Sequence, residues 1–164
     1  MKRLLILIPL VFLCCLGCQQ GEKVAAVDNE ADIQAIKDGY SEWEAGVNAA
    51  DIDRSLSSIA DDVVLIPPNE PAIIGKDAFR SYFQQIFDAF TVQEKYVVKD
   101  VKVSGDLAFT HFTYSGIYTL KANGESFKTE GNGIEIIERQ PDGVWKTIYS
   151  ICSDEGLVRP PLQE

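Results

Sequence analysis

The second half of the chain most constrains the fold, because it consists of four long segments with strand character separated by short turns. Each turn pairs a glycine with a polar residue, as in Gly105-Asp106, Asn123-Gly124 and Asp142-Gly143. Turns of this kind join neighbouring antiparallel strands. We therefore expect a meander of four antiparallel strands over residues 93–103, 107–120, 126–139 and 144–152.

The first half of the chain has the pattern of helices. Apolar residues recur in steps of three and four at Ile33, Ile36, Tyr40, Trp43 and Val47, which is the stripe of an amphipathic helix. Similar patterns predict helices over residues 30–48, 52–60 and 76–89, with short strands over 63–66 and 72–74. Helices followed by a meander indicate an α+β domain with the helices on one face of the sheet.

The N-terminus has the three-part layout of an export signal. Lys2 and Arg3 precede an apolar run from Leu4 to Leu16, which is shorter than the roughly 20 residues that span a bilayer. Leu16-Gly17-Cys18 resembles a bacterial lipobox, although Cys15 stands where such motifs usually have leucine. We expect Cys18 to carry the lipid; an ordinary secretory peptide cleaved nearby is the alternative.

This interpretation divides the chain into four parts and gives it a location. We expect a signal peptide over residues 1–17, a lipidated flexible tether over 18–29, a folded domain over 30–153 and a tail over 154–164. The protein would then be lipid-anchored in the bacterial cell envelope. Gln19 after the lipidated cysteine favours the outer membrane, facing the periplasm, in a Gram-negative cell.

Charge and residue usage narrow the classes of partner. The formal net charge is −10, and loss of Lys2 and Arg3 would make it about −12, so we expect no nucleic-acid partner and no membrane contact beyond the lipid. Cys152 is the one cysteine far from the N-terminus, and His111 is the single histidine. With no metal-ligand spacing in view, we expect neither a metal nor another cofactor.

Several spaced sequence blocks resemble the NTF2-like superfamily, and within it the SnoaL-like group. The resemblance covers most of residues 30–153 and rests on blocks 48–51 (NAAD), 60–65 (ADDVVL), 73–79 (IIGKDAF), 105–109 (GDLAF) and 142–148 (DGVWKTI). It implies a cone, in which three helices pack on a strongly curved, mainly antiparallel sheet around a mostly apolar pocket. It says little about function, because this fold carries enzymes as well as binding domains.

The ketosteroid isomerases of this superfamily provide a test for catalytic residues. They use a tyrosine on the first helix, a general-base aspartate at the end of the first strand and a second acid on a later strand. The resemblance puts Trp43 and Pro67 at the first two positions and Glu135 near the third. Proline cannot take up a proton, so we expect no ketosteroid-isomerase chemistry.

The same resemblance supplies the candidate site. It implies a concave face on which His111 could act as an acid or base, with Glu135 as its partner. The residues expected to contact a ligand are Trp43, Val47, Phe83, Phe87, Phe109, His111, Thr113, Ile148 and Ser150. It places Trp145, Tyr149 and Ile151 on the opposite face, where relatives often pair with a second copy, so we expect a homodimer.

Three functions therefore remain open. The first is a domain that binds a small apolar or aromatic ligand in the cone. The second is a cofactor-free acid–base enzyme of the isomerase, cyclase or dehydratase type that uses His111 and a carboxylate. The third is a dimeric scaffold with a vestigial pocket. The direction in which His111 points should separate the first two.

Overall fold

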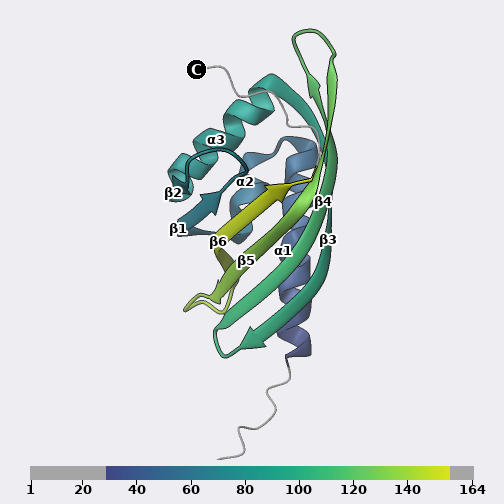
Figure 1. Cartoon of the computed structure of the whole chain (residues 1–164). Helices are drawn as coiled ribbons and strands as arrows, with labels where there is room; N and C mark the ends of the chain where they lie inside the picture. The colour runs from purple at the N-terminus through teal and green to yellow at the C-terminus, as the bar shows by residue number, and fades with distance from the viewer. Residues whose placement is uncertain (1–28, 156–164) are drawn as a thin grey trace, which may run out of the picture.

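The computed structural model describes residues 29–155, which form three helices and a six-stranded sheet (Figure 1). The expected signal peptide and lipid attachment at Cys18 lie outside the described residues, as does most of the expected tail. The elements are α1 (Glu30–Ala49), α2 (Ile52–Ser55), the 3-10 turn η1 (Leu56–Ser58), β1 (Ile59–Ile66), β2 (Ile73–Ile74), α3 (Lys76–Ala89), β3 (Phe90–Ser104), β4 (Leu107–Leu120), β5 (Ser126–Arg139) and β6 (Trp145–Asp154). In this part of the chain no helix is both long and apolar enough to cross a membrane.

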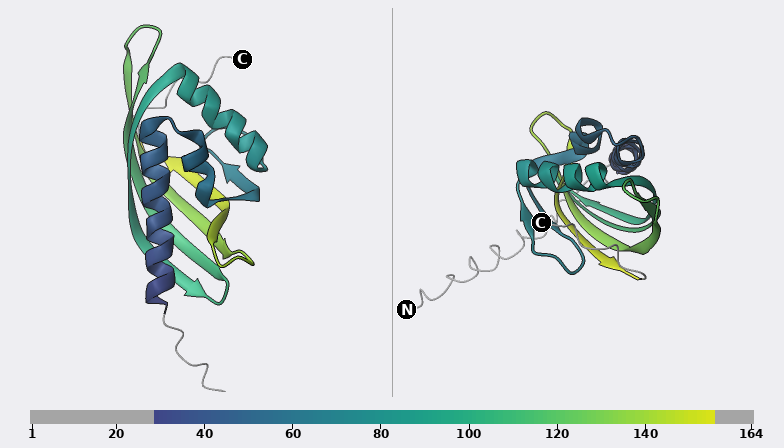
Figure 2. Two further views of the ribbon diagram at one scale, coloured as in Figure 1. Left: turned by 180° about the vertical axis from the view of Figure 1, so that it is seen from behind. Right: turned by 90° about the horizontal axis from the view of Figure 1, so that it is seen from above.

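The sheet confirms the expected α+β architecture. Its strand order is β2-β1-β6-β5-β4-β3, and every pair is antiparallel except β1 with β6. The long strands β3 to β5 bend around α1, and α3 crosses the wide end of the resulting cone (Figure 2). The concave face of the sheet therefore meets the helices, and its convex face points away from them.

The helices begin and end close to the expected residues, with one exception. Ala50 ends α1 in the left-handed conformation, and the Asp51 carboxylate accepts a hydrogen bond from the Arg54 backbone N–H to cap α2. The expected helix over residues 52–60 is wrong in its second half. There the chain turns through η1 and enters β1 at Ile59, because Ile59 pairs with Thr147 of β6 and its side chain is buried.

Two irregularities in the strands change which side chains face the helices. In β3 the pairing shifts between Val98 and Asp100, and in β6 it shifts so that Ile148 becomes an extra residue opposite β5. A bulge of this kind reverses the alternation of side chains between the two faces. Trp145 is consequently buried against α1, which corrects its expected position on the outer face. Beyond the bulge, Tyr149 lies outside as expected.

Two glycines in β5 make room for aromatic rings on the concave face. A Cβ on Gly133 would lie 2.0 Å from the Phe112 ring, and one on Gly131 would lie 2.7 Å from the Tyr114 hydroxyl. Phe112 and Tyr114 can therefore lie across β5, with Tyr96 of β3 beside them. These rings separate the interior of the cone into a wide end beneath α3 and a narrow end beside the start of α1.

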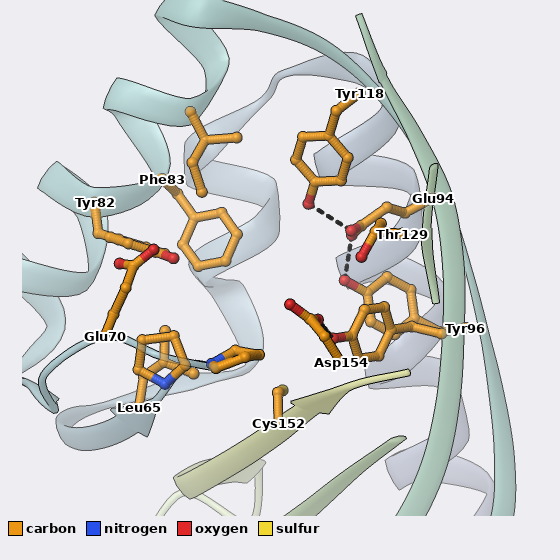
Figure 3. A pocket seen from close by; sticks show the side chains of 14 residues that line it. Leu65, Glu70, Tyr82, Phe83, Glu94, Tyr96, Tyr118, Thr129, Cys152 and Asp154 are labelled. Atoms are coloured by element: carbon orange, nitrogen blue, oxygen red, sulfur yellow. Dashed lines mark hydrogen bonds between the residues drawn. The ribbon is translucent and has the colours of Figure 1, made fainter. Parts of the chain in front are cut away.

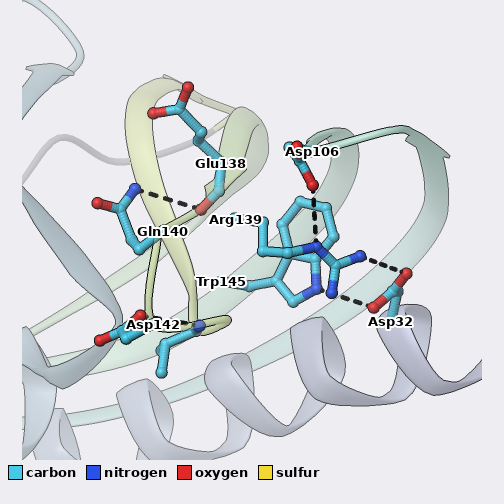
Figure 4. A network of polar contacts seen from close by, with 8 residues as sticks. Asp32, Asp106, Glu138, Arg139, Gln140, Asp142 and Trp145 are labelled. Atoms are coloured by element: carbon cyan, nitrogen blue, oxygen red, sulfur yellow. Dashed lines mark hydrogen bonds and ion pairs between the residues drawn. The ribbon is translucent and has the colours of Figure 1, made fainter.

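A polar network holds the narrow end closed (Figure 4). The Arg139 guanidinium donates to Asp32 of α1 at 2.6 Å and to Asp106 at 3.2 Å, and it lies 4.4 Å from the centre of the Trp145 ring. The Trp145 indole N–H also donates to Asp32, at 3.2 Å. The hydrogen bond from Arg139 lowers the pKa of Asp32. We interpret this network as structural, because it joins α1 to the β3–β4 turn and to β5 and β6.

Candidate functional site

A cavity of about 110 Å³ lies at the wide end of the cone, between α3, the loop after β1 and the concave face of β3 to β6 (Figure 3). Its apolar wall is formed by Leu65, Pro67, Pro68, Phe83 and Ile86. Its polar wall is formed by Glu70, Tyr82, Glu94, Tyr96, Tyr114, Tyr118, Thr129, Cys152 and Asp154. The cavity is thus lined by four tyrosines and three carboxylates, and by no Lys, Arg or His among the described residues.

Glu94 is the central polar group of this cavity. Its side chain is buried, and its carboxylate accepts hydrogen bonds from the Tyr118 hydroxyl at 2.5 Å and from the Tyr96 hydroxyl (Figure 3). Burial, and then the charge of Glu94, raises the pKa of Tyr96 well above its usual value. Tyr96 therefore stays protonated and acts as a hydrogen-bond donor to the carboxylate.

Helix α1 fixes the backbone on which Glu94 stands. The Asn48 side chain accepts from the Glu94 backbone N–H at 2.6 Å and donates to the Glu94 carbonyl at 2.8 Å. Glu44, one turn earlier, accepts from the Tyr96 backbone N–H at 2.8 Å. Since β3 is an edge strand, these side chains take the place of a neighbouring strand. They set the direction in which Glu94 and Tyr96 enter the cavity.

The end of β6 contributes a second acid to the cavity. Asp154 accepts a hydrogen bond from the Tyr114 hydroxyl, and burial followed by that bond raises the pKa of Tyr114. Cys152 lies beside them, and burial, together with the charge of Glu135, raises the pKa of its thiol to about 12. Such a thiol is almost entirely protonated at neutral pH and is a poor nucleophile.

A second carboxylate on the concave face, the half-buried Glu135, lies deeper in the cone. It accepts from the Tyr40 hydroxyl at 2.6 Å and from the Thr147 hydroxyl at 3.3 Å, and Tyr40 in turn is 2.6 Å from the Thr110 hydroxyl. Burial raises the pKa of Glu135, and the hydrogen bonds from Tyr40, Ser150 and Thr147 oppose that rise. The adjoining cavity has a volume of only about 40 Å³, so this site has little space for a ligand.

Comparison with known proteins identifies the family. Residues 40–147, about two thirds of the chain, match the SnoaL-like domain. The chain belongs to the SnoaL-like domain family. No curated protein matches it.

Solved structures agree with this assignment and with the expected fold. A ketosteroid isomerase-like protein from Erwinia carotovora atroseptica is 25% identical, with a TM-score of 0.71 over 78% of this chain and 99% of the other. A conserved protein from Planctomyces limnophilus is 20% identical, with a TM-score of 0.70 over 76% and 98% of the two chains. An NTF2-like protein of unknown function from Shewanella oneidensis is 17% identical, with a TM-score of 0.59 over 75% and 99%.

In this SnoaL-like domain, His111 and Glu135 lie on opposite faces of the sheet. Thr110 is the β4 residue opposite Glu135, whereas His111 is opposite Ile134, whose side chain is exposed on the convex face. The His111 ring lies 3.3 Å from the Asn132 side-chain oxygen. The expected concave position of His111 is therefore wrong, and the geometry does not support a direct His111–Glu135 pair.

The predicted assignment of β4 side chains to the two faces of the sheet is displaced by one residue. Phe109 and Thr113 share the convex face with His111, and Phe109 is 39% exposed. The residues that face the helices are Ala108, Thr110, Phe112, Tyr114 and Tyr118. Three residues predicted to contact a ligand, Phe109, His111 and Thr113, are thus placed away from the cavity.

The other predicted ligand contacts occupy several environments. Phe83 of α3 lines the main cavity as expected, and Trp43 lines the smaller one. Val47 and Phe87 are buried in the core between α1 and α3. Among the residues of β6, Ser150 is buried and hydrogen-bonded to Glu135, and Ile148 is the extra residue of the bulge rather than part of the main cavity wall.

Sequence reasoning missed the polar wall of the main cavity. Glu94 and Tyr96 continue the alternation of Phe90 and Val92, two buried residues of β3. A carboxylate on the apolar side of a strand was therefore a visible signal. Asp154, at the end of β6, carried no comparable signal. Within residues 29–155, no group of three or more His, Cys, Asp and Glu side chains could hold a metal ion.

Proposed function

We propose that this SnoaL-like domain binds a small molecule with an apolar or aromatic body in the cavity beneath α3. The observation that supports this most strongly is a cavity of about 110 Å³ whose aromatic walls surround one buried, hydrogen-bonded carboxylate, Glu94. Ligand sites in proteins commonly combine apolar walls with a few fixed polar groups in this way. Pro67 lines the cavity where the isomerases have their base, so ketosteroid-isomerase chemistry is not proposed.

Native mass spectrometry of the full-length chain tests this proposal. We expect a reproducible small-molecule adduct, or its uptake from a cell-envelope extract. Thr129→Leu should abolish the adduct because the larger side chain fills the cavity. Thr113→Leu is the matched control, since it makes the same change on the convex face of the neighbouring strand. Absence of any adduct, or equal loss in both variants, would contradict binding in the cavity.

Acid–base catalysis is the second candidate function, and the position of the Glu94 carboxylate at the cavity favours it. A carboxylate that faces a cavity and accepts from two phenol hydroxyls could take up a proton from a bound carbonyl compound. His111 takes no part in this proposed reaction, because it lies on the convex face of the sheet. Deuterium exchange of the α-protons of 2-cyclohexenone in D₂O, followed by NMR, tests it. Exchange that is lost in Glu94→Gln would support catalysis, and no exchange above the buffer rate would contradict it.

We also propose that the convex face pairs with a second copy of the chain. Phe109, Ile134, Ile136, Tyr149 and Ile151 form neighbouring rows on this face and are 39–46% exposed. Acidic and basic side chains lie on the same strands, including Lys146 opposite Glu138, so the face can meet itself without net repulsion.

Sedimentation equilibrium of the full-length chain tests the dimer. Tyr149→Glu should yield monomers, whereas Thr91→Glu, which adds the same charge at an exposed position of β3, should leave a dimer. A wild-type monomer would contradict the proposal. Trp145→Glu is unsuitable because Trp145 is part of the core.

The envelope location remains part of this proposal and rests on the N-terminal sequence. A lipid on Cys18 would tether the acidic domain, and the residues between Cys18 and α1 would separate it from the membrane surface. Mass spectrometry of the mature N-terminus tests this. Cys18→Ser should eliminate the lipid-modified species, while Cys15→Ser should retain it. A lipid-free mature N-terminus in the wild type would contradict the anchor.

A further inference from the structure

We infer that the ligand of the main cavity donates a hydrogen bond to the protein from a hydroxyl group on an aromatic or apolar body, as in a phenol. This inference rests on the proposed binding function and specifies the chemical class of its ligand. It follows from the direction of the hydrogen bonds on the polar wall of the cavity and from the composition of the opposite wall.

The hydrogen bonds on the polar wall run from tyrosines to carboxylates. The Tyr118 hydroxyl donates to Oε1 of Glu94 at 2.5 Å, and the Tyr96 hydroxyl donates to the other oxygen, Oε2. At the end of β6, the Tyr114 hydroxyl donates to Oδ1 of Asp154. Since a phenol has a single O–H, each of these three tyrosines directs its proton to a carboxylate and not to the space of the cavity.

The tyrosines keep these protons and therefore act toward a ligand as acceptors. Burial and the charge of Glu94 raise the pKa of Tyr96, and burial followed by the hydrogen bond to Asp154 raises the pKa of Tyr114. A phenol that donates its proton still has oxygen lone pairs, and an ionised carboxylate has acceptor sites only. Tyr96, Tyr114 and Asp154 thus present acceptors to a molecule that enters the cavity.

The opposite wall supplies little that would donate to a ligand. Pro67 and Pro68, in the loop after β1, have no backbone N–H, and the neighbouring Leu65 and Phe83 have apolar side chains. Thr129 adds a hydroxyl that can donate as well as accept. A ligand hydroxyl, which also donates and accepts, matches this combination.

A ligand that can only accept hydrogen bonds is disfavoured at such a wall. A ketone or ether oxygen would place its lone pairs against those of Tyr96 and Tyr114. To gain a hydrogen bond it would have to draw a phenol proton away from Glu94 or Asp154, which would cost the carboxylate a bond that stabilises its charge. The arrangement is the reverse of an oxyanion hole, in which donors point at the ligand. This preference counts against carbonyl compounds and so sets the inference apart from the catalytic candidate.

The two walls show how a phenol would lie in the cavity. Glu94, Tyr96 and Tyr118 occupy one side, and Phe83 and Leu65 occupy the other (Figure 3). A hydroxyl placed beside the tyrosine oxygens would leave the ring of the ligand toward Phe83, where aromatic rings pack favourably against one another. The hydroxyl would also extend the existing chain of hydrogen bonds, and such chains strengthen their members.

Three aromatic probes of similar size separate hydrogen-bond direction from apolar packing: p-cresol, anisole and ethylbenzene. p-Cresol and anisole are isomers, but the hydroxyl of p-cresol can donate, whereas the ether oxygen of anisole only accepts and ethylbenzene does neither. Binding of each to the full-length chain is measured by isothermal titration calorimetry at neutral pH. We expect p-cresol to bind at least about tenfold more tightly than the other two, as one hydrogen bond to a charged network allows.

Glu94→Gln locates the effect, because it changes the polarity of the wall. Gln places a donating N–H where one carboxylate oxygen accepts from Tyr96 or Tyr118, so that phenol must turn its own O–H toward the cavity. The preference for p-cresol over anisole should then fall to less than about threefold. Glu130→Gln makes the same exchange at an exposed position of β5 and should leave the preference within about twofold of the wild type. Equal changes in the two variants would overturn the assignment to this wall.

The outcomes also separate this inference from the proposed function. The comparison of the three probes needs no variant, so it stands even if Glu94→Gln disturbs folding. If anisole or ethylbenzene binds as tightly as p-cresol, the cavity binds aromatic molecules and the donor preference is wrong. If none of the probes binds, the donor preference is also wrong, and the adduct measured by native mass spectrometry decides separately whether the cavity binds a small molecule. Binding of p-cresol that is lost in Thr129→Leu and retained in Thr113→Leu would support both proposals.

Discussion

Two carboxylates, the buried Glu94 and the half-buried Glu135, stand on the concave face of the same sheet and differ in the space beside them. Each accepts a hydrogen bond from a tyrosine hydroxyl, of Tyr118 at 2.5 Å and of Tyr40 at 2.6 Å. Glu94 borders a cavity of about 110 Å³, whereas Glu135 borders one of about 40 Å³. The carboxylate–tyrosine arrangement is therefore not by itself the mark of a ligand site. The open volume distinguishes the two.

The surroundings of the two groups explain why one volume is open and the other is closed. Glu135 lies between α1 and β6, where Thr147 and Ser150 also donate to it. Glu94 borders the cavity together with Phe83 and Ile86 of α3, the helix that crosses over the sheet (Figure 2). We interpret Glu135 as a group that organises the core and Glu94 as the buried carboxylate of the proposed ligand cavity.

The largest expected effect comes from removing the carboxylate of the closed site, Glu135. Glu135→Ala leaves the Tyr40 and Thr147 hydroxyls without their acceptor and creates a void, so we expect it to lower the free energy of unfolding by about 3 kcal/mol. Glu94→Ala should cost only about 1 kcal/mol, because the cavity beside Glu94 can admit water to Tyr96 and Tyr118. Urea denaturation of both variants measures the difference. A Glu94→Ala variant at least as unstable as Glu135→Ala would reverse the interpretation.

The second prediction concerns the aromatic rings between the wide and narrow ends of the cone. Gly133→Ala would place a Cβ 2.0 Å from the Phe112 ring, so the ring must move, and we expect a loss of about 2 kcal/mol from overpacking. Thermal and urea unfolding measure this loss. Adding Phe112→Leu should recover part of the stability, because the smaller side chain removes the clash. A double variant less stable than Gly133→Ala alone would show that the strain lies elsewhere.

The fold could be predicted from the sequence because its signals are local. The apolar stripe of α1, the Asp51 cap and the glycine turns each follow from a few neighbouring residues, and the structure confirms the helices and long strands they predicted. The early end of the second helix could not be read in this way. There a pairing with β6, distant in sequence, determines that Ile59 is in a strand.

The faces of the strands could not be predicted from alternation alone. In β4, both alternating sets of side chains contain apolar residues, with Phe109 and Ile117 in one and Phe112 and Tyr118 in the other. Either alternating set is therefore compatible with a buried face, and a shift of one residue moves His111 to the opposite face of the sheet. In β6 the bulge at Ile148 is invisible in the sequence. Ser150 was therefore placed correctly and Trp145 was not.

Residues of the site that depend on tertiary contacts were also beyond local reasoning. Asn48 belongs to a block that indicated the family, but its role depends on β3, which is distant in the sequence. Its two hydrogen bonds to the Glu94 backbone become visible only when α1 is placed beside the edge strand. The family block therefore contains a residue that positions the proposed site.

Asn48→Ala sharpens the contrast by loosening only the open site. Loss of two hydrogen bonds to the β3 backbone should lower the free energy of unfolding by about 1 kcal/mol and weaken binding of the small-molecule adduct, because Glu94 loses its fixed direction. Native mass spectrometry and urea denaturation measure the two effects. Gln34→Ala removes one exposed side-chain bond from the same helix and should change neither. Unchanged affinity in Asn48→Ala would show that α1 does not position Glu94.

The smallest expected effect is the pH dependence that Glu135 contributes to stability. Burial raises its pKa in the folded protein above the ordinary value of 4.5, so the folded state retains a proton that the unfolded chain has released. The contribution of Glu135 is therefore fully present below pH 4.5 and is lost as the pH rises through the folded-state pKa. Because hydrogen bonds from Tyr40, Ser150 and Thr147 oppose the rise in pKa, the effect should be modest.

Urea denaturation of the wild type and of Glu135→Gln between pH 4 and pH 8 isolates the contribution of Glu135, since the other titrating groups are common to both. The wild type should lose stability relative to the variant as the pH increases, and a relative gain would show that the hydrogen bonds outweigh burial at this carboxylate.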